Sequence, residues 1–249
     1  MKTRVSIINY SNTIPFTYGL LNSKDLQPLA EFSYGYPAQV AEMLCHNQVD
    51  VSIISVGAIP SIPNAHIISN YCISATNKVD SVLLCSNRPI DQIETIVLDY
   101  QSRTTNILVQ ILARYAWNVT PKFIMGTAGY ETEANDFAKV IIGDRALNYA
   151  SRFSYVYDLA NEWNKTFHLP FVFAAWVANK QLSKEFIETF ESACQYGITH
   201  IDDAIRSQQK TFSFNIHDYL YHSVEFNLND EKRASIDLFF EKGKELGLF

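Results

Sequence analysis

The stretch that decides the fold consists of four pieces in chain order: Ser81-Val-Leu-Leu-Cys-Ser86, Thr95-Ile-Val-Leu-Asp-Tyr100, Gln101-Ser-Arg-Thr-Thr-Asn106 and the run from Ile107 to Trp117. The first two pieces are short and apolar and are bounded by turn-forming residues, which is typical of buried strands. The fourth repeats apolar residues at the spacing of an amphipathic helix. The stretch therefore predicts strands, a polar turn and a helix.

The polar turn predicts an anion site at the start of that helix. The candidate contacts are Ser102, Arg103, Thr104 and Thr105. Backbone N–H groups without intrahelical acceptors, the positive end of the helix dipole and a guanidinium converge there, which suits a carboxylate or phosphate. The alternative is that Ser102 or Thr104 only caps the helix. In that case Arg103 points to solvent or pairs with Asp99 or Glu131.

Working outward toward the N-terminus, strands alternate with helices. The expected strands are residues 4–10, 32–36, 49–56 and 66–74. Helices are expected to begin at Pro15 and Pro37, because proline is favoured in a first helical turn. This alternation predicts βαβ units and a largely parallel sheet.

Polar residues follow two of these strands. Asn12 comes after the first strand and Ser55 ends the third. Ligands of open α/β sheets bind at the carboxyl ends of strands, so both residues are candidate contacts. The alternative for Asn12 is a turn residue that satisfies its own backbone.

The C-terminal half continues the α/β pattern and then becomes helical. Residues 138–143 and 169–177 are expected strands, and Asp144 is expected to cap a short helix. Residues 154–167 carry a helical stripe, and the pattern from Ser183 onward is helical, with the last stripes at 219–226 and 234–246.

No repeat or linker divides the chain, so two α/β lobes joined by continuous strands are expected. The first lobe is predicted to hold residues 1–84 and 176–249, and the second residues 85–175. The long apolar runs Ser81–Ser86 and Phe171–Val177 are the expected crossings, because both can stay buried on two faces.

Composition excludes several classes of protein. The chain has 249 residues, 47% of them hydrophobic, and a net charge of −6 without a basic block, so nucleic acid and anionic membranes are poor partners. No signal-peptide core or run of about 20 apolar residues is present, and the four cysteines are widely spaced like reduced core thiols. We expect a cytoplasmic protein. The six histidines form no pair at metal-binding spacing, so no metal site is expected.

Several motifs resemble those of a known family. They are Tyr10-Ser-Asn12 followed by Pro15, Leu98-Asp-Tyr-Gln-Ser-Arg-Thr-Thr105, Ile142-Gly-Asp-Arg-Ala-Leu147, Asp158-Leu-Ala-Asn-Glu-Trp163 and Leu169-Pro-Phe-Val-Phe-Ala-Ala-Trp176. Together with Ser81–Ser86 they cover nearly the whole chain in order, and they resemble the chorismate dehydratases of the futalosine route to menaquinone. One departure is Phe167-His168, where that family usually has Thr-Gly.

The resemblance implies a periplasmic-binding-protein type II-like fold with the ligand cleft between two lobes, and no metal or organic cofactor. It implies that chorismate loses water to give 3-[(1-carboxyvinyl)oxy]benzoate. On this view the residues at the helix start hold the ring carboxylate, while Ser55 and Ser86 are candidates for the second carboxylate. Asn12 is the expected catalytic residue, and Asp144 of the Ile-Gly-Asp signature is a further substrate contact. No histidine or glutamate stands out as a base, so the substrate's own carboxylate is the expected proton acceptor.

Two alternatives remain open from the sequence. The first is a sister enzyme of the same fold, 1,4-dihydroxy-6-naphthoate synthase, although Asn9-Tyr-Ser-Asn12 is not its expected N-terminal signature. The second is a non-enzymatic cytosolic binding protein for an aromatic carboxylate.

Overall fold

The structure is a computed structural model that describes residues 2–8, 10–35, 37–209 and 211–249. Asn9 and Tyr36, at the ends of two expected segments, lie outside the described residues. The strands are β1 Thr3–Ile8, β2 Ala30–Gly35, β3 Val51–Ser55, β4 His66–Ala75, β5 Val82–Ser86, β6 Thr95–Leu98, β7 Lys122–Met125, β8 Ala138–Ile142, β9 Tyr155–Asp158, β10 Phe171–Ala178 and β11 Glu225–Asn227.

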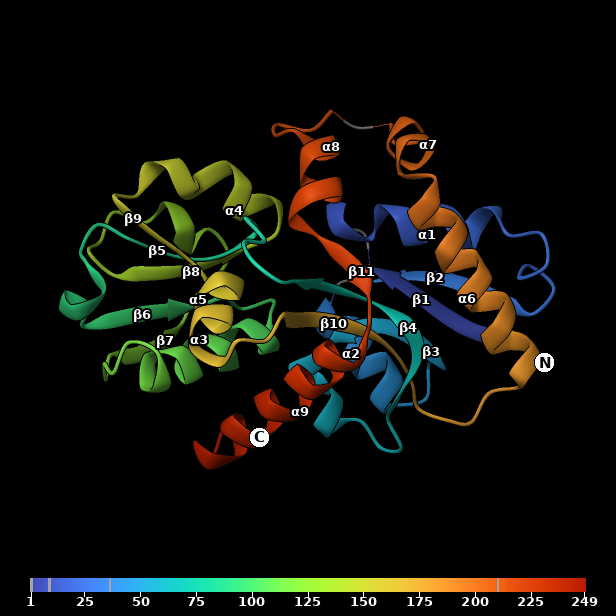
Figure 1. Cartoon of the computed structure of the whole chain (residues 1–249), viewed down its shortest axis with the longest axis horizontal. Coiled ribbons are helices and arrows are strands. Elements are labelled where there is room, and N and C mark those ends of the chain that lie inside the picture. The colour runs from blue at the N-terminus through green and yellow to red at the C-terminus, as the bar shows by residue number, and fades with distance from the viewer. Residues whose placement is uncertain (1, 9, 36, 210) are drawn as a thin grey trace. The chain divides into compact units, whose positions relative to one another are not determined.

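Helices connect most of these strands (Figure 1). The α-helices are α1 Ile14–Asn22, α2 Pro37–Cys45, α3 Arg103–Tyr115, α4 Asp144–Tyr149, α5 Leu159–Phe167, α6 Lys184–Thr199, α7 Ile201–Arg206, α8 Ile216–Asp218 and α9 Asp230–Glu245. The short 3₁₀ turns are η1 Ser11–Thr13, η2 Val56–Ser61, η3 Ile90–Gln92, η4 Tyr130–Thr132 and η5 Ala150–Arg152, and η6 Tyr219–Ser223 is a π-helical turn. No helix in the described part of the chain is both long and apolar enough to cross a membrane.

The chain divides into two compact units. The first unit holds residues 1–73 and 173–229, and the second holds residues 74–172 and 230–249. The chain therefore crosses three times, within β4, within β10 and between Asn229 and Asp230. The crossing in β10 lies within the expected run 171–177, whereas the prediction for Ser81–Ser86 is wrong, because β5 lies wholly in the second unit.

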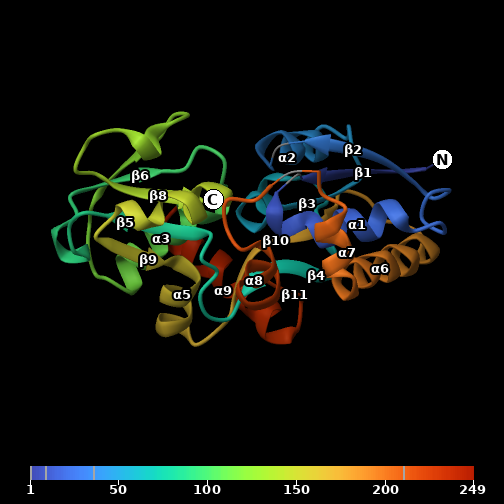
Figure 2. The ribbon, with the colours of Figure 1, turned by 90° about the horizontal axis from the view of Figure 1, so that it is seen from above.

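The first unit is built on a sheet of strand order β11-β4-β10-β3-β1-β2. β1 pairs in parallel with both β2 and β3, while β10 is antiparallel to β3. Right-handed crossovers from β1 to β2 and from β2 back to β3 place α1 and α2 on opposite faces, as Figure 2 shows. The predicted parallel βαβ units at the N-terminus are therefore present.

Two glycines let α1 and α6 pack at very short range in the first unit (Figure 1). A methyl group on Gly19 would lie 2.0 Å from the carbonyl oxygen of Ala193, and one on Gly197 would lie 1.9 Å from the carbonyl oxygen of Pro15. Both obstacles are backbone atoms, which cannot move aside as a side chain does. Only glycine fits at these two positions.

The second unit is built on a sheet of strand order β7-β6-β8-β5-β9. β6 pairs in parallel with β7 and with β8, whereas β5 is antiparallel to both β8 and β9. The parallel strands β6, β7 and β8 therefore end at one edge of the sheet, and β5 ends at the opposite edge.

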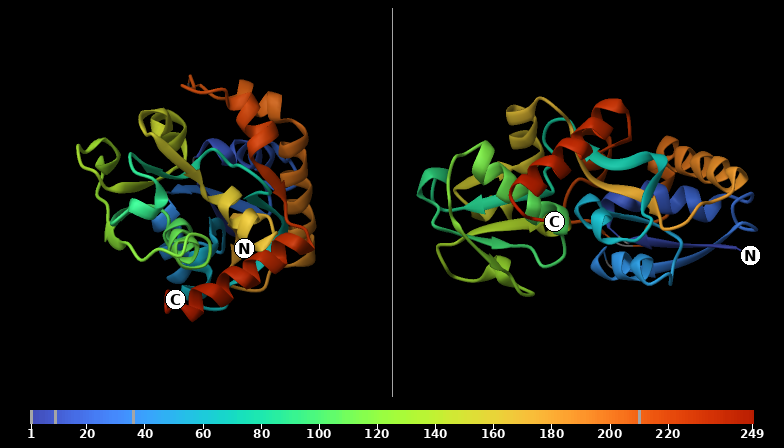
Figure 3. Two further views of the ribbon diagram at one scale, coloured as in Figure 1. Left: turned by 60° about the vertical axis from the view of Figure 1, so that its left-hand side comes forward. Right: turned by 90° about the horizontal axis from the view of Figure 1, so that it is seen from below.

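The C-terminal helix α9 belongs to the second unit, not to the first as expected from the sequence (Figure 3). Its buried Phe239 ring lies 6.3 Å from the ring of Trp163 and 5.5 Å from that of Phe171. The Tyr115 hydroxyl at the end of α3 donates to Glu245 of α9. An amphipathic stripe in the sequence shows that a helix has an apolar face, but not which core covers it.

Three local predictions are corrected. Residues 154–167 form the strand β9 and then α5, because the Asp158 side chain accepts the backbone N–H groups of Ala160 and Asn161 and starts the helix there. Residues 219–226 form a π-helical turn and β11 in place of a helix. The cap of α4 is Gly143, at φ 61°, and not Asp144, which is the first helical residue.

The departure from the family pattern at Phe167-His168 has a structural role in the second unit. His168 adopts the left-handed conformation, φ 57°, at the C-cap of α5, which glycine usually supplies. The Phe167 ring packs 4.3 Å from Trp163 and 6.3 Å from Tyr115. It therefore lies near the C-terminal end of α3, far from the helix start that carries Ser102.

An ion-pair cluster fastens the first unit where β1 and β3 begin. The Asp50 carboxylate lies 2.5 Å from Nη2 of Arg4 and 3.0 Å from Nζ of Lys180. Burial alone would raise the pKa of Asp50, but hydrogen bonds from Arg4 and Lys180 outweigh burial and lower the pKa to about 2. The ionised form is therefore the one that stabilises the fold.

We expect Asp50→Asn to lower the free energy of unfolding by roughly 1–2 kcal/mol near neutral pH, since Arg4 and Lys180 are partly exposed and water screens their charges. A carboxyl whose pKa is lowered by folding contributes stability above its ordinary pKa of 3.8 and loses it as the pH falls toward 2. The difference in the free energy of unfolding between wild type and variant should therefore become smaller below about pH 4. Urea unfolding from pH 6 to pH 3 measures this. A difference that stays constant, or the same trend in the exposed Asp136→Asn control, would contradict it.

Candidate functional site

The candidate site lies at the edge of the second unit's sheet where β6, β7 and β8 end. Because these strands are parallel, the segments that follow them meet at the same edge. The segment after β6 carries Ser102, Arg103, Thr104 and Thr105, and the segment after β8 carries Asp144. The structure therefore brings five of the predicted site residues to one edge.

Helix α3 begins with a serine cap. The Ser102 Oγ accepts the backbone N–H of Thr105 at 3.2 Å and lies 2.8 Å from the Thr105 Oγ1. The capping alternative is therefore correct for Ser102. The N–H of Thr105 is occupied, and the first intrahelical hydrogen bond runs from the Asn106 N–H to the Ser102 carbonyl oxygen. The N–H of Arg103, the first residue of α3, precedes that bond and is the donor that an anion at this helix start would use.

Arg103 is exposed, and its guanidinium makes no hydrogen bond or ion pair within the part of the chain that the structure describes. The partners considered for it, Asp99 and Glu131, are bound by Arg145 instead. Arg103 thus carries a positive charge at the start of α3 that no described acidic group neutralises. This arrangement favours an anion at the helix start.

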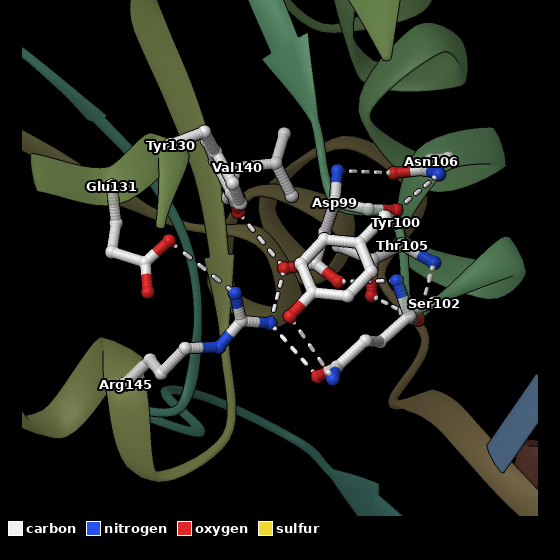
Figure 4. A network of polar contacts seen from close by, with 10 residues as sticks. Asp99, Tyr100, Ser102, Thr105, Asn106, Tyr130, Glu131, Val140 and Arg145 are labelled. Carbon is white, nitrogen blue, oxygen red and sulfur yellow. Dashed lines mark hydrogen bonds and ion pairs between the residues drawn. The ribbon is translucent and has the colours of Figure 1, made fainter. Parts of the chain in front are cut away.

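Behind the helix start lies a buried polar network that the sequence did not predict (Figure 4). At its centre is Asp99, which is 0% exposed. Its carboxylate accepts hydrogen bonds from Tyr130 Oη at 2.8 Å, Arg145 Nη2 at 2.6 Å and the backbone N–H of Gln101 at 2.7 Å. The Asn106 side chain is paired in both directions with the Asp99 backbone, at 3.0 and 2.7 Å.

The charge states of this network follow from burial and its partners. Burial raises the pKa of Asp99, against the opposing effect of Arg145 and the N–H of Gln101. Burial alone would lower the pKa of Arg145, but Asp99, Tyr130 and Glu131 outweigh burial and raise it, so the guanidinium stays charged. Burial and the Asp99 carboxylate raise the pKa of Tyr130, so its hydroxyl stays a donor.

Ser86 is not part of this edge. β5 runs antiparallel to β8, with Cys85 opposite Lys139, so Ser86 lies beside the start of β8. The first and last residues of β8 are separated by roughly 13 Å at the usual rise of a strand. The fully buried Ser86 hydroxyl accepts the backbone N–H of Arg88 at 3.0 Å, which is a turn contact.

In the first unit, Asn12 follows β1 and Ser55 is the last residue of the neighbouring parallel strand β3, so both lie at the same edge of that sheet. Thr13 satisfies the turn after β1, because its hydroxyl binds the carbonyls of Ile8 and Tyr10 and accepts the Tyr10 N–H. The half-buried Asn12 side chain has no hydrogen bond to a described residue. The turn-residue alternative therefore fits Thr13 and leaves the Asn12 amide available.

The chain was compared with known families and structures. The family model described as menaquinone biosynthesis matches residues 3–245. This chain belongs to that menaquinone biosynthesis family. The chain is also 21% identical to the chorismate dehydratase of Thermus thermophilus, over 91% of this chain and 94% of that protein.

Solved structures similar to this family member show the fold. A protein of Archaeoglobus fulgidus has a TM-score of 0.74 at 18% identity and covers 100% of this chain and 98% of its own. A Candida albicans protein with the generic periplasmic binding protein fold has a TM-score of 0.65 at 16% identity, covering 100% and 91%. The alkanesulfonate-binding protein of Xanthomonas axonopodis pv. citri has a TM-score of 0.66 at 11% identity, covering 97% and 93%. The predicted periplasmic-binding-protein-like α/β fold is therefore confirmed.

We expect Ser102→Ala to lower the free energy of unfolding by about 1 kcal/mol, the usual effect of losing a serine cap. Ser183 caps α6 in the first unit by accepting the Phe186 N–H at 3.2 Å, the same distance as at Ser102. Ser183→Ala should therefore cost about as much and serves as the matched control. Urea unfolding followed by circular dichroism measures both. A Ser102→Ala variant as stable as the wild type would contradict the cap.

Proposed function

We propose that this family member is a chorismate dehydratase, a carbon–oxygen lyase that converts chorismate to 3-[(1-carboxyvinyl)oxy]benzoate and water in menaquinone biosynthesis. The observation that carries the proposal is the similarity to the Thermus thermophilus chorismate dehydratase over 91% of this chain and 94% of that protein. Membership in the menaquinone biosynthesis family, over residues 3–245, supports it.

The start of α3 is the proposed site for the ring carboxylate. The N–H group of Arg103, the helix dipole and the Arg103 guanidinium supply positive charge there. When the ring C–H bond next to the hydroxyl-bearing carbon breaks, its electron pair passes through the ring double bonds toward this carboxylate. Donors that hold the carboxylate therefore also stabilise the charge that develops in the transition state.

The other proposed contacts have chemistry that suits different parts of chorismate. Ser55 is the candidate for the enolpyruvyl carboxylate, and Asn12 orients the reacting part of the substrate through its available amide. Asp144 can accept a hydrogen bond from a substrate hydroxyl but cannot hold a second carboxylate, because both are anions. The location of Ser86 beside the start of β8 argues against it as a partner of the α3 start.

The proposed reaction is a loss of water. A proton leaves the ring carbon next to the hydroxyl-bearing carbon, the carbon–oxygen bond to the hydroxyl breaks, and the ring becomes aromatic. The enolpyruvyl carboxylate of the substrate accepts this proton and passes it to the departing hydroxyl, which leaves as water, so the carboxylate is ionised again in the product. The chain's own residues then contribute mainly orientation and charge stabilisation.

Incubation of the pure chain with chorismate tests the proposal. We expect an aromatic product lighter than chorismate by one water, seen by ultraviolet absorbance and mass spectrometry. Ser102→Ala should lower kcat/KM by roughly tenfold, since it loosens the donors at the α3 start, while the equally destabilised Ser183→Ala should turn over chorismate like the wild type. Chorismate binding without turnover would overturn the proposal and favour a binding protein.

A second prediction concerns Asn12. If its amide orients the reacting part of chorismate, Asn12→Ala should lower kcat by roughly 10²–10³ while binding changes much less. If Asn12 is only structural, the variant loses roughly 1 kcal/mol of stability and keeps its single-turnover rate. The control is Asn22→Ala in the same unit, where the side chain only binds the Tyr18 carbonyl at 2.8 Å. An unchanged single-turnover rate for Asn12→Ala removes it as a catalytic residue.

A further inference from the structure

Three segments at the carboxyl edge of the second unit converge on one side chain, Arg145. It stands in the first turn of α4, after β8, and its Nη2 donates to the Asp99 carboxylate at 2.6 Å and to Gln101 Oε1 at 3.0 Å, both after β6. Its Nη1 lies 3.5 Å from Glu131 Oε2, in the segment after β7. Figure 4 shows the guanidinium between Asp99 and Glu131. One residue therefore ties together the ends of three parallel strands.

The shape of arginine is what makes this contact possible. A planar guanidinium directs N–H groups in several fixed directions, whereas a lysine ammonium is a single point of charge. The Arg145 guanidinium carbon also lies 5.4 Å from the ring centre of Tyr100 and 5.9 Å from that of Tyr130. Only 22% of the Arg145 side chain is exposed, so the surrounding residues hold it in one orientation.

The contact reaches the start of α3 through Asp99. One Asp99 oxygen binds Arg145, and the other accepts the backbone N–H of Gln101 at 2.7 Å. The Asp99 backbone is paired with the Asn106 side chain at 3.0 and 2.7 Å, so the turn from 99 to 106 closes on itself. Among the described residues that contact the fully buried Asp99, Arg145 supplies the positive charge. Without it the Asp99 carboxylate would be a buried charge with no cationic partner, so the turn would have to rearrange or let water reach the carboxylate.

We infer that Arg145 is a positioning residue that fixes the start of α3, and with it the N–H and guanidinium donors of Arg103, by holding Asp99, Gln101 and Glu131 together. The role of those donors toward a substrate carboxylate rests on the proposed function. In this role Arg145 acts through the donors at the α3 start and not through a substrate contact of its own. Its effect is to keep the donors in the geometry that binds the ligand, so the ligand does not have to impose that geometry. When Arg145 is lost, the donors are no longer held in place and the reaction becomes slower.

Two variants and one matched control test this inference. Arg145→Gln removes the charge, and Arg145→Lys keeps a charge for Asp99 but cannot span Asp99, Gln101 and Glu131 at once. The control is Arg88→Gln, which breaks an ion pair with Asp136 in the same unit at 2.7 Å, where the two side chains are 46% and 74% exposed. If Arg145→Gln does not fold, Arg145→Lys decides the question.

The first measurement needs no substrate. Hydrogen–deuterium exchange of residues 99–106 should become faster in both Arg145 variants, whereas in Arg88→Gln it should stay at the wild-type rate. An unchanged exchange rate in this segment for the Arg145 variants would overturn the inference. This result stands whether or not the wild-type chain converts chorismate, so a failure of the proposed function is seen separately.

The second measurement uses chorismate. We expect kcat/KM of Arg145→Lys to fall roughly 10- to 100-fold, mostly through kcat, although the lysine charge keeps the fold stable. For Arg145→Gln, millimolar guanidinium ion should restore part of the lost rate. A merely structural role would leave turnover per folded molecule unchanged in Arg145→Lys. Turnover of that variant within twofold of the wild type would therefore overturn the positioning role.

Discussion

The burial of one carboxylate, that of Asp99, governs the polar architecture of the second unit. An ionised group without solvent needs donors on every side, because the interior supplies no other compensation for lost hydration. Arg145, Tyr130 and the N–H of Gln101 supply them, and they come from the segments after three different strands. The need to satisfy this one charge thus explains why loops that differ in sequence and length converge at one edge of the sheet.

Strand direction decides which polar residues can act together. The parallel strands β6, β7 and β8 bring their following segments to a common edge, and β1 and β3 do the same for Asn12 and Ser55 in the first unit. β5 is as apolar as its neighbours but antiparallel, so Ser86 arrives at the other edge. A short apolar run predicts a strand, but its direction depends on partners distant in the sequence.

The same limit explains how much of the molecule could be predicted. The strand–helix alternation, the α/β class and the family resemblance all follow from local patterns, and so does the proposal of an anion site at residues 102–105. The location of α9 does not follow from its sequence, because its apolar stripe would fit any apolar face. In the structure Phe239 of α9 packs against Trp163 and Phe171. Arg145 was also missed as a partner of Asp99, since the two are far apart in sequence and no spacing rule links them. Its place directly after Asp144, at the end of an apolar strand, was the one available signal.

The contact between Gly19 and Gly197 has a consequence for how this protein tolerates change. Asn12 sits one turn before α1, and α1 is held against α6 at a separation that only hydrogen side chains allow. A random mutagenesis screen for loss of activity would therefore return positions 19 and 197 beside the residues that touch a ligand. Such hits would arise because a larger side chain displaces the helix that carries the turn of Asn12. Since the clash is with backbone atoms, which every residue has, trimming a neighbouring side chain should not rescue them.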